Sequence, residues 1–287
     1  MSVRSSVRSC EICGGPTAAF VLRGGATLHR CARCGHLLRD LDAAPAGHRD
    51  HAYGGEPTLD RWRLALTYRL LASGPAPRSV FEIGYGTGSM LRRFLDAGAA
   101  VAGADPDQLE LAVDPEVRRR GDLHATGVEQ VDTDRVRADL VYGIHVLEHV
   151  TDPLRTLQVA ADLLEPGGTA QFLTPAGDSD GLRLYGQAWW MLEDPTHVRF
   201  FTAESLRRAA TSVGLVDVRI TRPALDSLTT DVGSLTRMLR PRPRPHGVLG
   251  ERPVLFAGMA SAPLVLAARA ARPALRPTLH LTARKPA

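Results

Sequence analysis

The middle of the chain alternates between short apolar runs and longer amphipathic segments. The apolar runs have the length and the β-branched or small residues of buried strands, and lie at 79–83, 100–104, 139–144, 169–174, 215–221 and 278–283, with a weaker run at 118–124. The amphipathic segments have helical spacing and lie at 61–72, 89–97, 109–113, 153–164 and 203–213. Strands and helices that alternate at these lengths predict a doubly wound, parallel α/β sheet.

The N-terminal segment follows a different pattern. Two short stretches, 18–22 and 26–30, flank Gly24 and Gly25, which predicts a hairpin. The four cysteines surround this hairpin as two Cys-x-x-Cys pairs, Cys10 and Cys13, then Cys31 and Cys34. Four thiolates at this spacing suit tetrahedral Zn²⁺ and leave no open coordination position, so a structural zinc ribbon is expected. The spacing leaves open a set of redox-active or simply buried thiols.

The C-terminal part contains an apolar segment between the last two expected strands. Residues 223–277 begin with a Pro-Arg alternation at 241–245 and continue into a sixteen-residue uncharged run at 253–268. That run is shorter than the ~20 residues that a membrane-spanning helix needs. Arginines flank this run on both sides. We therefore expect residues 223–277 to form either a lid over a substrate site or an anchor on an anionic membrane surface.

The charge distribution separates this region from the rest. The chain of 287 residues has a net charge of +4, with 34 Arg and one Lys among its basic residues. Residues 223–287 hold ten basic and three acidic side chains, so the remainder is slightly acidic. With 44% hydrophobic and 23% charged residues, the composition excludes a disordered or histone-like chain. The first twenty residues contain no apolar stretch of signal-peptide length, so we expect a cytoplasmic protein with reduced cysteines, peripheral at a membrane if 223–277 is an anchor.

A glycine-rich loop follows the first expected strand of the alternating region. Residues 81–88 spell Phe-Glu-Ile-Gly-Tyr-Gly-Thr-Gly, with glycines that allow a tight turn and a close approach of backbone to ligand. Asp105 ends the next strand 21 residues after Gly84, where a carboxylate can accept hydrogen bonds from ribose hydroxyls. The pattern favours a nucleotide-like cofactor, and a helix cap is the alternative for Asp105.

Two further motifs narrow the cofactor. Leu-Glu-His-Val at 147–150 follows a later strand, and Leu-Glu-Pro-Gly-Gly at 164–168 precedes the next. With Glu82 and the glycine loop, residues 78–222 resemble the class I S-adenosylmethionine-dependent methyltransferases, whose sheet ends in an antiparallel strand. The resemblance implies that the loop faces the methionine end, Asp105 the ribose and Asp122-Leu123 the adenine. The implied cofactor site is Glu82, Gly84, Tyr85, Gly86, Gly88, Asp105, Pro106, Asp122, Leu123, His145 and Val146.

The combination of ribbon and catalytic motifs resembles bacterial deoxysugar and natural-product methyltransferases. In that group the acceptor pocket is lined by a histidine from each of two motifs and by a tyrosine just after the ribbon. The matching positions are His149, His197 and Tyr53. The resemblance implies methylation of a small molecule, a sugar or natural-product intermediate, at oxygen or carbon, with a histidine as general base. This chain has Thr196 where those enzymes can carry a glutamate.

Three other functions fit parts of the sequence. Residues 145–149 spell His-x-x-Glu-His, the inverted zinc-protease signature, which requires both histidines on one helix. Some ribosomal-RNA methyltransferases also carry a zinc ribbon, and the basic C-terminal part would then meet phosphates. A non-catalytic S-adenosylmethionine- and zinc-binding module is the third. The LEHV and His197 motifs favour the small-molecule enzyme, and nucleic acid is not the expected partner.

The predicted organisation has five parts. A zinc ribbon occupies 1–45, a linker with a packing helix 46–77, and the cofactor-binding core 78–222. A helical insertion follows at 223–277, and 278–287 hold the last strand and tail.

Overall fold

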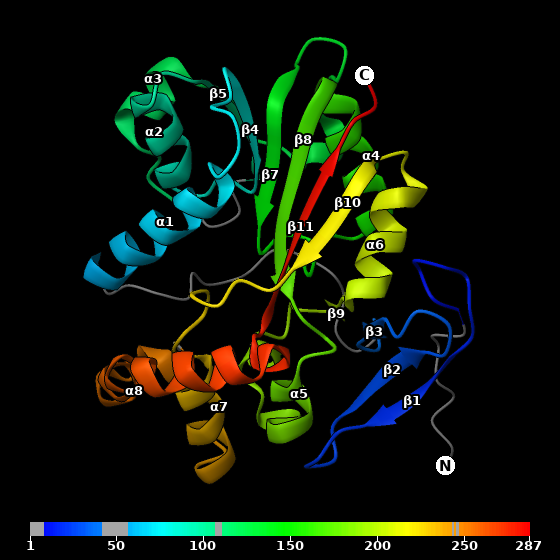
Figure 1. Cartoon of the computed structure of the whole chain (residues 1–287), viewed down its shortest axis with the longest axis vertical. Helices are drawn as coiled ribbons and strands as arrows, with labels where there is room; N and C mark the ends of the chain where they lie inside the picture. Colours follow the sequence, from blue (N-terminus) through cyan, green and yellow to red (C-terminus); the bar gives the residue numbers. More distant parts are fainter. Residues whose placement is uncertain (1–8, 42–56, 107–110, 243, 245–246) are drawn as a thin grey trace.

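The computed structural model describes residues 9–41, 57–106, 111–242, 244 and 247–287. In this part of the chain, seven strands form the main sheet in the order β10-β11-β8-β7-β4-β5-β6 (Figure 1). Their bounds are β4 Ser79–Ile83, β5 Ala100–Ala104, β6 Asp122–His124, β7 Ala138–Ile144, β8 Leu164–Pro175, β10 Val216–Thr221 and β11 Thr278–Arg284. Strands β4 to β8 pair in parallel, whereas β11 is antiparallel to both β8 and β10. The predicted α/β sheet with an antiparallel last strand is confirmed.

Helices cover both faces of this sheet. The covering helices are α1 Pro57–Leu71, α2 Ser89–Asp96, α3 Pro115–Arg120, α4 Pro153–Leu163 and α6 Ala203–Ser212. Helices α5 Asp180–Tyr185, α7 Thr230–Leu239 and α8 Arg252–Ala271 lie beyond one end of the sheet (Figure 1). Alternate strand residues point to opposite faces: Phe81 packs with the α4 and α6 side, and Val80 with the α1, α2 and α3 side. The chain is therefore doubly wound around two apolar layers.

One helix lies later in the chain than predicted. The expected helix at 109–113 is wrong for residues 111–113, which form no helix, and residues 107–110 lie outside the described part. The helix starts at Pro115 instead, because Asp114 caps it by accepting the N–H groups of Glu116 and Val117. Proline suits the first helical position, where its missing N–H is not needed. The third strand of the core is correspondingly short.

The N-terminal hairpin does not stand alone. Its strands β1 Thr17–Val21 and β2 Thr27–Cys31 pair antiparallel, and β3 Leu37–Leu38 adds to β2. Strand β9 Arg199–Phe200, which follows β8 in the core part of the sequence, pairs with β3 (Figure 1). The core thus donates one edge strand to the ribbon sheet, so the ribbon has a defined position on the core.

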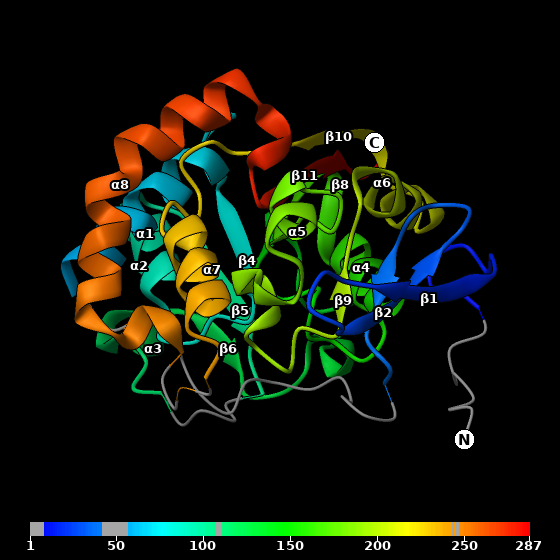
Figure 2. The ribbon, with the colours of Figure 1, turned by 90° about the horizontal axis from the view of Figure 1, so that it is seen from below.

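The insertion lies beyond the carboxyl edge of the main sheet. Helix α7, which the sequence pattern did not predict, packs against α8, and Figure 2 shows both beside α5. Within the described residues, α8 has the length and apolar composition that crossing a membrane requires. Its bounds enclose the predicted apolar run at 253–268.

Candidate functional site

A cavity of about 380 Å³ opens at the carboxyl ends of β4, β5 and β7. This is where ligands bind in open α/β sheets, and the volume lies within the roughly 300–1,000 Å³ of small-molecule sites. Its walls are Ile83, Gly84, Gly86, Ala104, Asp105, Pro106, Gly127, Val128, Glu129, Ile144, His145, Val146, His149, Val150, Thr151 and Asp152. Gly84, Gly86, Asp105, Pro106, His145, Val146 and His149 are thus brought together, as the sequence predicts.

The glycine loop forms the floor of this cavity. Gly84 has φ +75° and Gly86 has φ +50°, which favour glycine. A Cβ on Gly84 would come within 2.9 Å of Val146, so the loop packs tightly on the segment after β7. The Asp105 carboxylate accepts the Gly86 N–H at 2.9 Å, which ties the ends of β4 and β5 together. The loop is therefore a fixed cradle of backbone around a ligand-sized space.

Several predicted cofactor residues do not line the cavity. Glu82 is buried beneath the loop, where the Tyr142 hydroxyl donates to it at 3.1 Å. Burial raises the pKa of Glu82 well above its ordinary value. The remaining predicted residues that do not line the cavity are Tyr85, Gly88, Asp122 and Leu123. Asp122 pairs with Ala102, two residues before β5 ends, so the far wall is built by 127–129 instead.

His145 enters the cavity from a strained turn just after β7. Its φ of +56° lies in the left-handed region, which a histidine rarely adopts. Its Nδ1 lies 2.9 Å from the buried carboxylate of Glu148, which also accepts the Thr174 hydroxyl at 3.0 Å. Burial alone raises the pKa of Glu148, but His145, with the other nearby histidines, lowers it to about 2. Glu148 is thus an anion that holds the turn in place.

His149 has a defined proton arrangement. Its Nδ1 lies 2.9 Å from the Thr196 hydroxyl, and Thr196 donates to Asp194 at 2.6 Å. Because that hydroxyl has a single proton, Nδ1 of His149 must be the donor. Neutral His149 then carries its lone pair on Nε2. The sequence analysis missed this role of Thr196, although its position one residue before His197 had singled it out.

His197 lies behind His149, outside the cavity lining. The two ring centroids are 4.6 Å apart in an edge-to-face arrangement. His197 donates through Nδ1 to the Met191 carbonyl at 2.7 Å, and its Nε2 lies 3.8 Å from the Asp194 carboxylate. The structure therefore brings the two histidines together. Tyr53, the third predicted catalytic residue, lies outside the described residues.

The His-x-x-Glu-His segment does not have the geometry of a zinc protease. Residues 147–149 form a turn rather than a helix, and His145 bonds to Glu148. Ligand atoms of Glu148, His149 and His197 lie within 4.8 Å of one another. Both oxygens of Glu148 are already engaged by His145 and Thr174, which favours a hydrogen-bonded network over a metal ligand set.

The four cysteines converge at one point on the ribbon. Three of the Sγ–Sγ distances are 3.5–3.6 Å, and all four sulfurs lie within 4.8 Å of one another. Tetrahedral zinc with Zn–S bonds of about 2.3 Å places sulfurs about 3.8 Å apart, so the donor set fits this ion. Burial favours the thiol of Cys31, but backbone N–H groups of Cys34 and Arg33 lower its pKa to about 7.

A buried arginine connects this cysteine centre to the cavity. Arg199 in β9 donates to both carboxylate oxygens of Glu11, at 2.6 and 3.1 Å, and Glu11 lies between the first two cysteines. The same guanidinium donates to the carbonyls of Leu147, Val150 and Thr151, in the cavity-lining loop. The sequence analysis missed Arg199, whose signal was a cation inside the apolar run 198–201.

Comparison with known sequences identifies the family to which this fold belongs. The profile of the family described as "Methyltransferase domain" matches residues 58–220, more than half of the chain. A tRNA U34 carboxymethyltransferase from Klebsiella pneumoniae subsp. pneumoniae is 29% identical over 169 residues, 56% of this chain and 49% of that protein. A ubiquinone biosynthesis O-methyltransferase from Alkalilimnicola ehrlichii is 30% identical over 148 residues, 48% of this chain and 59% of that one. The match spans about half the length of these relatives.

Comparison with solved structures gives the same fold. A Galdieria sulphuraria protein assigned as a sarcosine dimethylglycine methyltransferase superposes with a TM-score of 0.55. The similarity covers 82% of this chain and 93% of that one, at 17% sequence identity. At this identity the likeness concerns the fold.

Proposed function

The chain belongs to the methyltransferase domain family, and from this membership we propose that it transfers a methyl group from S-adenosylmethionine to a small molecule. The observation that carries the proposal is His149 on the wall of a glycine-lined cavity, with its lone pair fixed on Nε2. That atom is buried in this structure, and we propose that it accepts the proton that an acceptor loses as it is methylated once the acceptor displaces the groups that cover it. No metal or covalent intermediate is needed for such a step.

The cavity residues have separate roles in binding. Gly84 and Gly86 would hold the methionine end, Asp105 and Pro106 the ribose, and the 127–129 segment the adenine. His145 and Val146 would close over the sulfonium side. When bound, S-adenosylmethionine supplies an electrophilic methyl group. The protein then has to align the acceptor with that methyl group and exclude water.

Proton removal is the chemical task of this chain's own residues. His149 Nε2 would take the proton of the acceptor X–H as X receives the methyl group that bound S-adenosylmethionine would supply. Thr196 accepts from Nδ1 and passes the interaction on to Asp194, which stabilises the imidazolium that forms. His197 packs edge-on against His149 and orients it. Tyr53 remains a predicted contributor.

The proposed acceptor is a hydroxyl-bearing or C–H-acidic sugar or natural-product intermediate. Relatives named as O-methyltransferases support an oxygen acceptor: they include ubiquinone biosynthesis and malonyl-acyl-carrier-protein O-methyltransferases. The ribbon is proposed to hold one structural zinc ion, since its four thiolates leave no position for a substrate.

Methyl-labelled S-adenosylmethionine tests the proposal. Purified protein is incubated with a panel of nucleotide-sugars, and the products are identified by mass spectrometry. We expect His149→Gln to lower turnover by roughly 10²–10⁴-fold while S-adenosylmethionine affinity, measured by calorimetry, is retained. His124→Gln, outside the cavity lining, is the matched control.

Other outcomes point elsewhere. Full turnover in His149→Gln contradicts the base assignment. Binding of NADH in place of S-adenosylmethionine contradicts the cofactor. Salt-sensitive retention of RNA together with labelled RNA product would replace the small-molecule acceptor with a nucleic acid.

A further inference from the structure

Helix α8 has an exposed face without polar side chains. Its 18-residue apolar window is only 17% buried, whereas apolar helices of globular proteins normally lie in the core. Phe256 is 61% exposed and Leu264 is 76% exposed. At 100° per residue, six of the exposed positions, 256, 260, 263, 264, 267 and 271, fall on one side of the helix. All of them are apolar, which makes a stripe along most of the helix.

The opposite face of α8 is fixed to the protein. Val254, Gly258 and Arg269 are buried and share that face. A Cβ on Gly258 would come within 2.9 Å of the Thr229 side chain, so the helix lies close to the start of α7. The helix therefore lies along the surface of the molecule, and crossing a bilayer would require it to leave this packing.

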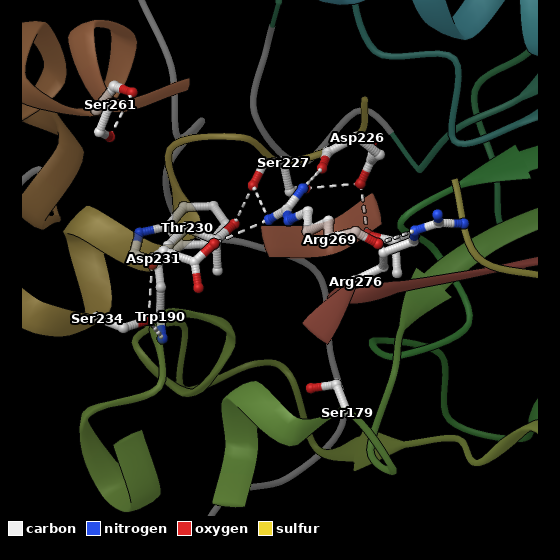
Figure 3. Close-up of polar contacts among 12 residues, drawn as sticks. Ser179, Trp190, Asp226, Ser227, Thr230, Asp231, Ser234, Ser261, Arg269 and Arg276 are labelled. Carbon is white, nitrogen blue, oxygen red and sulfur yellow. Dashed lines mark hydrogen bonds and ion pairs between the residues drawn. The ribbon is translucent and has the colours of Figure 1, made fainter. Parts of the chain in front are cut away.

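A buried arginine secures the C-terminal end of the helix. Arg269 donates to the carbonyls of Asp226 and Ser227 at 2.7 and 3.0 Å, and to the Asp231 carboxylate at 3.1 Å (Figure 3). The arginine is 1% exposed. Its charge is therefore used inside the insertion, by the 226–231 segment, and does not reach the outer apolar stripe.

Exposed arginines stand at both ends of the stripe. Arg252 lies at the N-terminal end, Arg272 at the C-terminal end, and Arg240 and Arg242 follow α7. Arg242 pairs with Glu251 and Arg272 with Asp180, whereas Arg240 and Arg252 have no carboxylate partner among the described residues. An apolar strip between cationic ends matches a bilayer surface, which offers acyl chains beneath anionic headgroups.

We propose that the outer face of α8 docks this protein on the surface of an anionic lipid bilayer. A second copy of the chain fits less well. A twofold axis would bring Arg252 of one copy beside Arg252 or Arg272 of the other, and like charges would meet at both ends of the contact. The first segment of the insertion turns inward instead: Asp226 lies 4.0 Å from His145 at the cavity. The insertion therefore approaches one cavity-lining residue through its loop and forms part of the outer surface through α8.

Vesicle flotation tests this docking. The full chain is mixed with vesicles of phosphatidylcholine alone or of phosphatidylcholine with phosphatidylglycerol. We expect the protein to float with the anionic vesicles at low salt and to be released by high salt. The double variant Phe256→Glu/Leu264→Glu should lower the bound fraction by about tenfold or more, because glutamates on this stripe meet the anionic surface. Val21→Glu, at a site 66% exposed on β1, should float like the wild type.

Folding and self-association are measured in the same samples. The thermal midpoint and S-adenosylmethionine affinity of the double variant should equal those of the wild type. Absence of flotation by the wild type, or unchanged flotation by the double variant, overturns the proposal. A dimer in light scattering that becomes a monomer in the double variant would assign the stripe to self-association and overturn it as well. Flotation needs no methyl transfer, so it can fail while the proposed reaction stands.

Discussion

The ribbon and the insertion are both attached to the same main sheet, but by different interactions. The ribbon shares a sheet with β9, and Arg199 links its Glu11 directly to the loop that lines the cavity. The insertion is joined to the core by bonds such as those from Arg237 to the Ala188 and Trp189 carbonyls, whereas Arg269 donates to backbone carbonyls of the insertion's own loop and to Asp231. Its helix α8 then exposes apolar side chains.

The two regions thus contain buried arginines with different roles. Arg199 joins two parts of the molecule, so a change in the ribbon reaches the cavity wall. Arg269 holds one part together, so a change there should stay within the insertion. The ribbon is therefore expected to affect cofactor binding, and the insertion to affect what the outer surface contacts.

Removal of the ribbon metal should have the largest effect. Structural zinc contributes apparent free energies of about 10–16 kcal/mol in zinc-finger peptides, and a ribbon this small has little core of its own. We expect Cys34→Ser to lower the thermal midpoint and to weaken S-adenosylmethionine binding, because Glu11 then no longer holds Arg199. Elemental analysis should give one zinc per wild-type chain and less in the variant. Wild-type cofactor affinity in zinc-free protein would show that the two sites are independent.

The substitution Arg199→Met should have the next largest effect on stability and cofactor binding. Breaking a buried ion pair costs about 3–5 kcal/mol, and because Glu11 is 21% exposed and keeps His36 at 2.9 Å, we expect a loss of about 3 kcal/mol. Urea unfolding should report this loss, and calorimetry should report weaker S-adenosylmethionine binding. Arg208→Met is the matched control, since the Arg208–Glu204 pair is an exposed pair worth about 0–1 kcal/mol. A double-mutant cycle that combines Arg199→Met with Glu11→Gln measures the interaction energy of the pair. If the two losses of folding free energy simply add, the two side chains are not coupled.

The pH dependence of stability should involve the strand that follows the insertion. Burial lowers the pKa of His280 to about 4, although Asp226 opposes the shift. Folding then favours the neutral ring. This stabilisation is complete above pH 6.5 and is lost as the pH falls toward 4, by up to about 3 kcal/mol. Urea unfolding at several pH values should give a flatter profile for His280→Asn than for the wild type. Identical profiles would assign the acid sensitivity to other groups.

Arg269→Met should have the smallest effect of the four on the cofactor site. Its ion pair with Asp231 is buried to the same extent as that of Arg199 with Glu11, so we expect a comparable loss of about 3 kcal/mol in folding free energy. Limited proteolysis should cut within 223–277 more rapidly, whereas S-adenosylmethionine affinity should match the wild type. A fall in affinity as large as that of Arg199→Met would remove the distinction between the two regions.

The regular parts of the fold were predictable because their signals are local. Strand β4, the glycine loop and helix α4 follow from apolar runs, glycines and a capping Asp152. The helix expected at 109–113 was wrong because Asp114 and Pro115 favour a start one turn later. Helix α7 was missed since its sequence mixes threonine, serine and glycine, and packing on α8 stabilises it.

For the functional residues, the sequence determined which chemical groups are present, and the tertiary structure decided which of them act together. Four cysteines at close spacing, and glycines and an aspartate at strand ends, carry their own spacing rules. No such rule connects Glu11 to Arg199, or Thr196 to His149, because those contacts join segments that are 188 and 47 residues apart. The exposure of α8 also depends on the fold: an apolar run predicts burial, and only packing of its opposite face on α7 leaves the stripe outside.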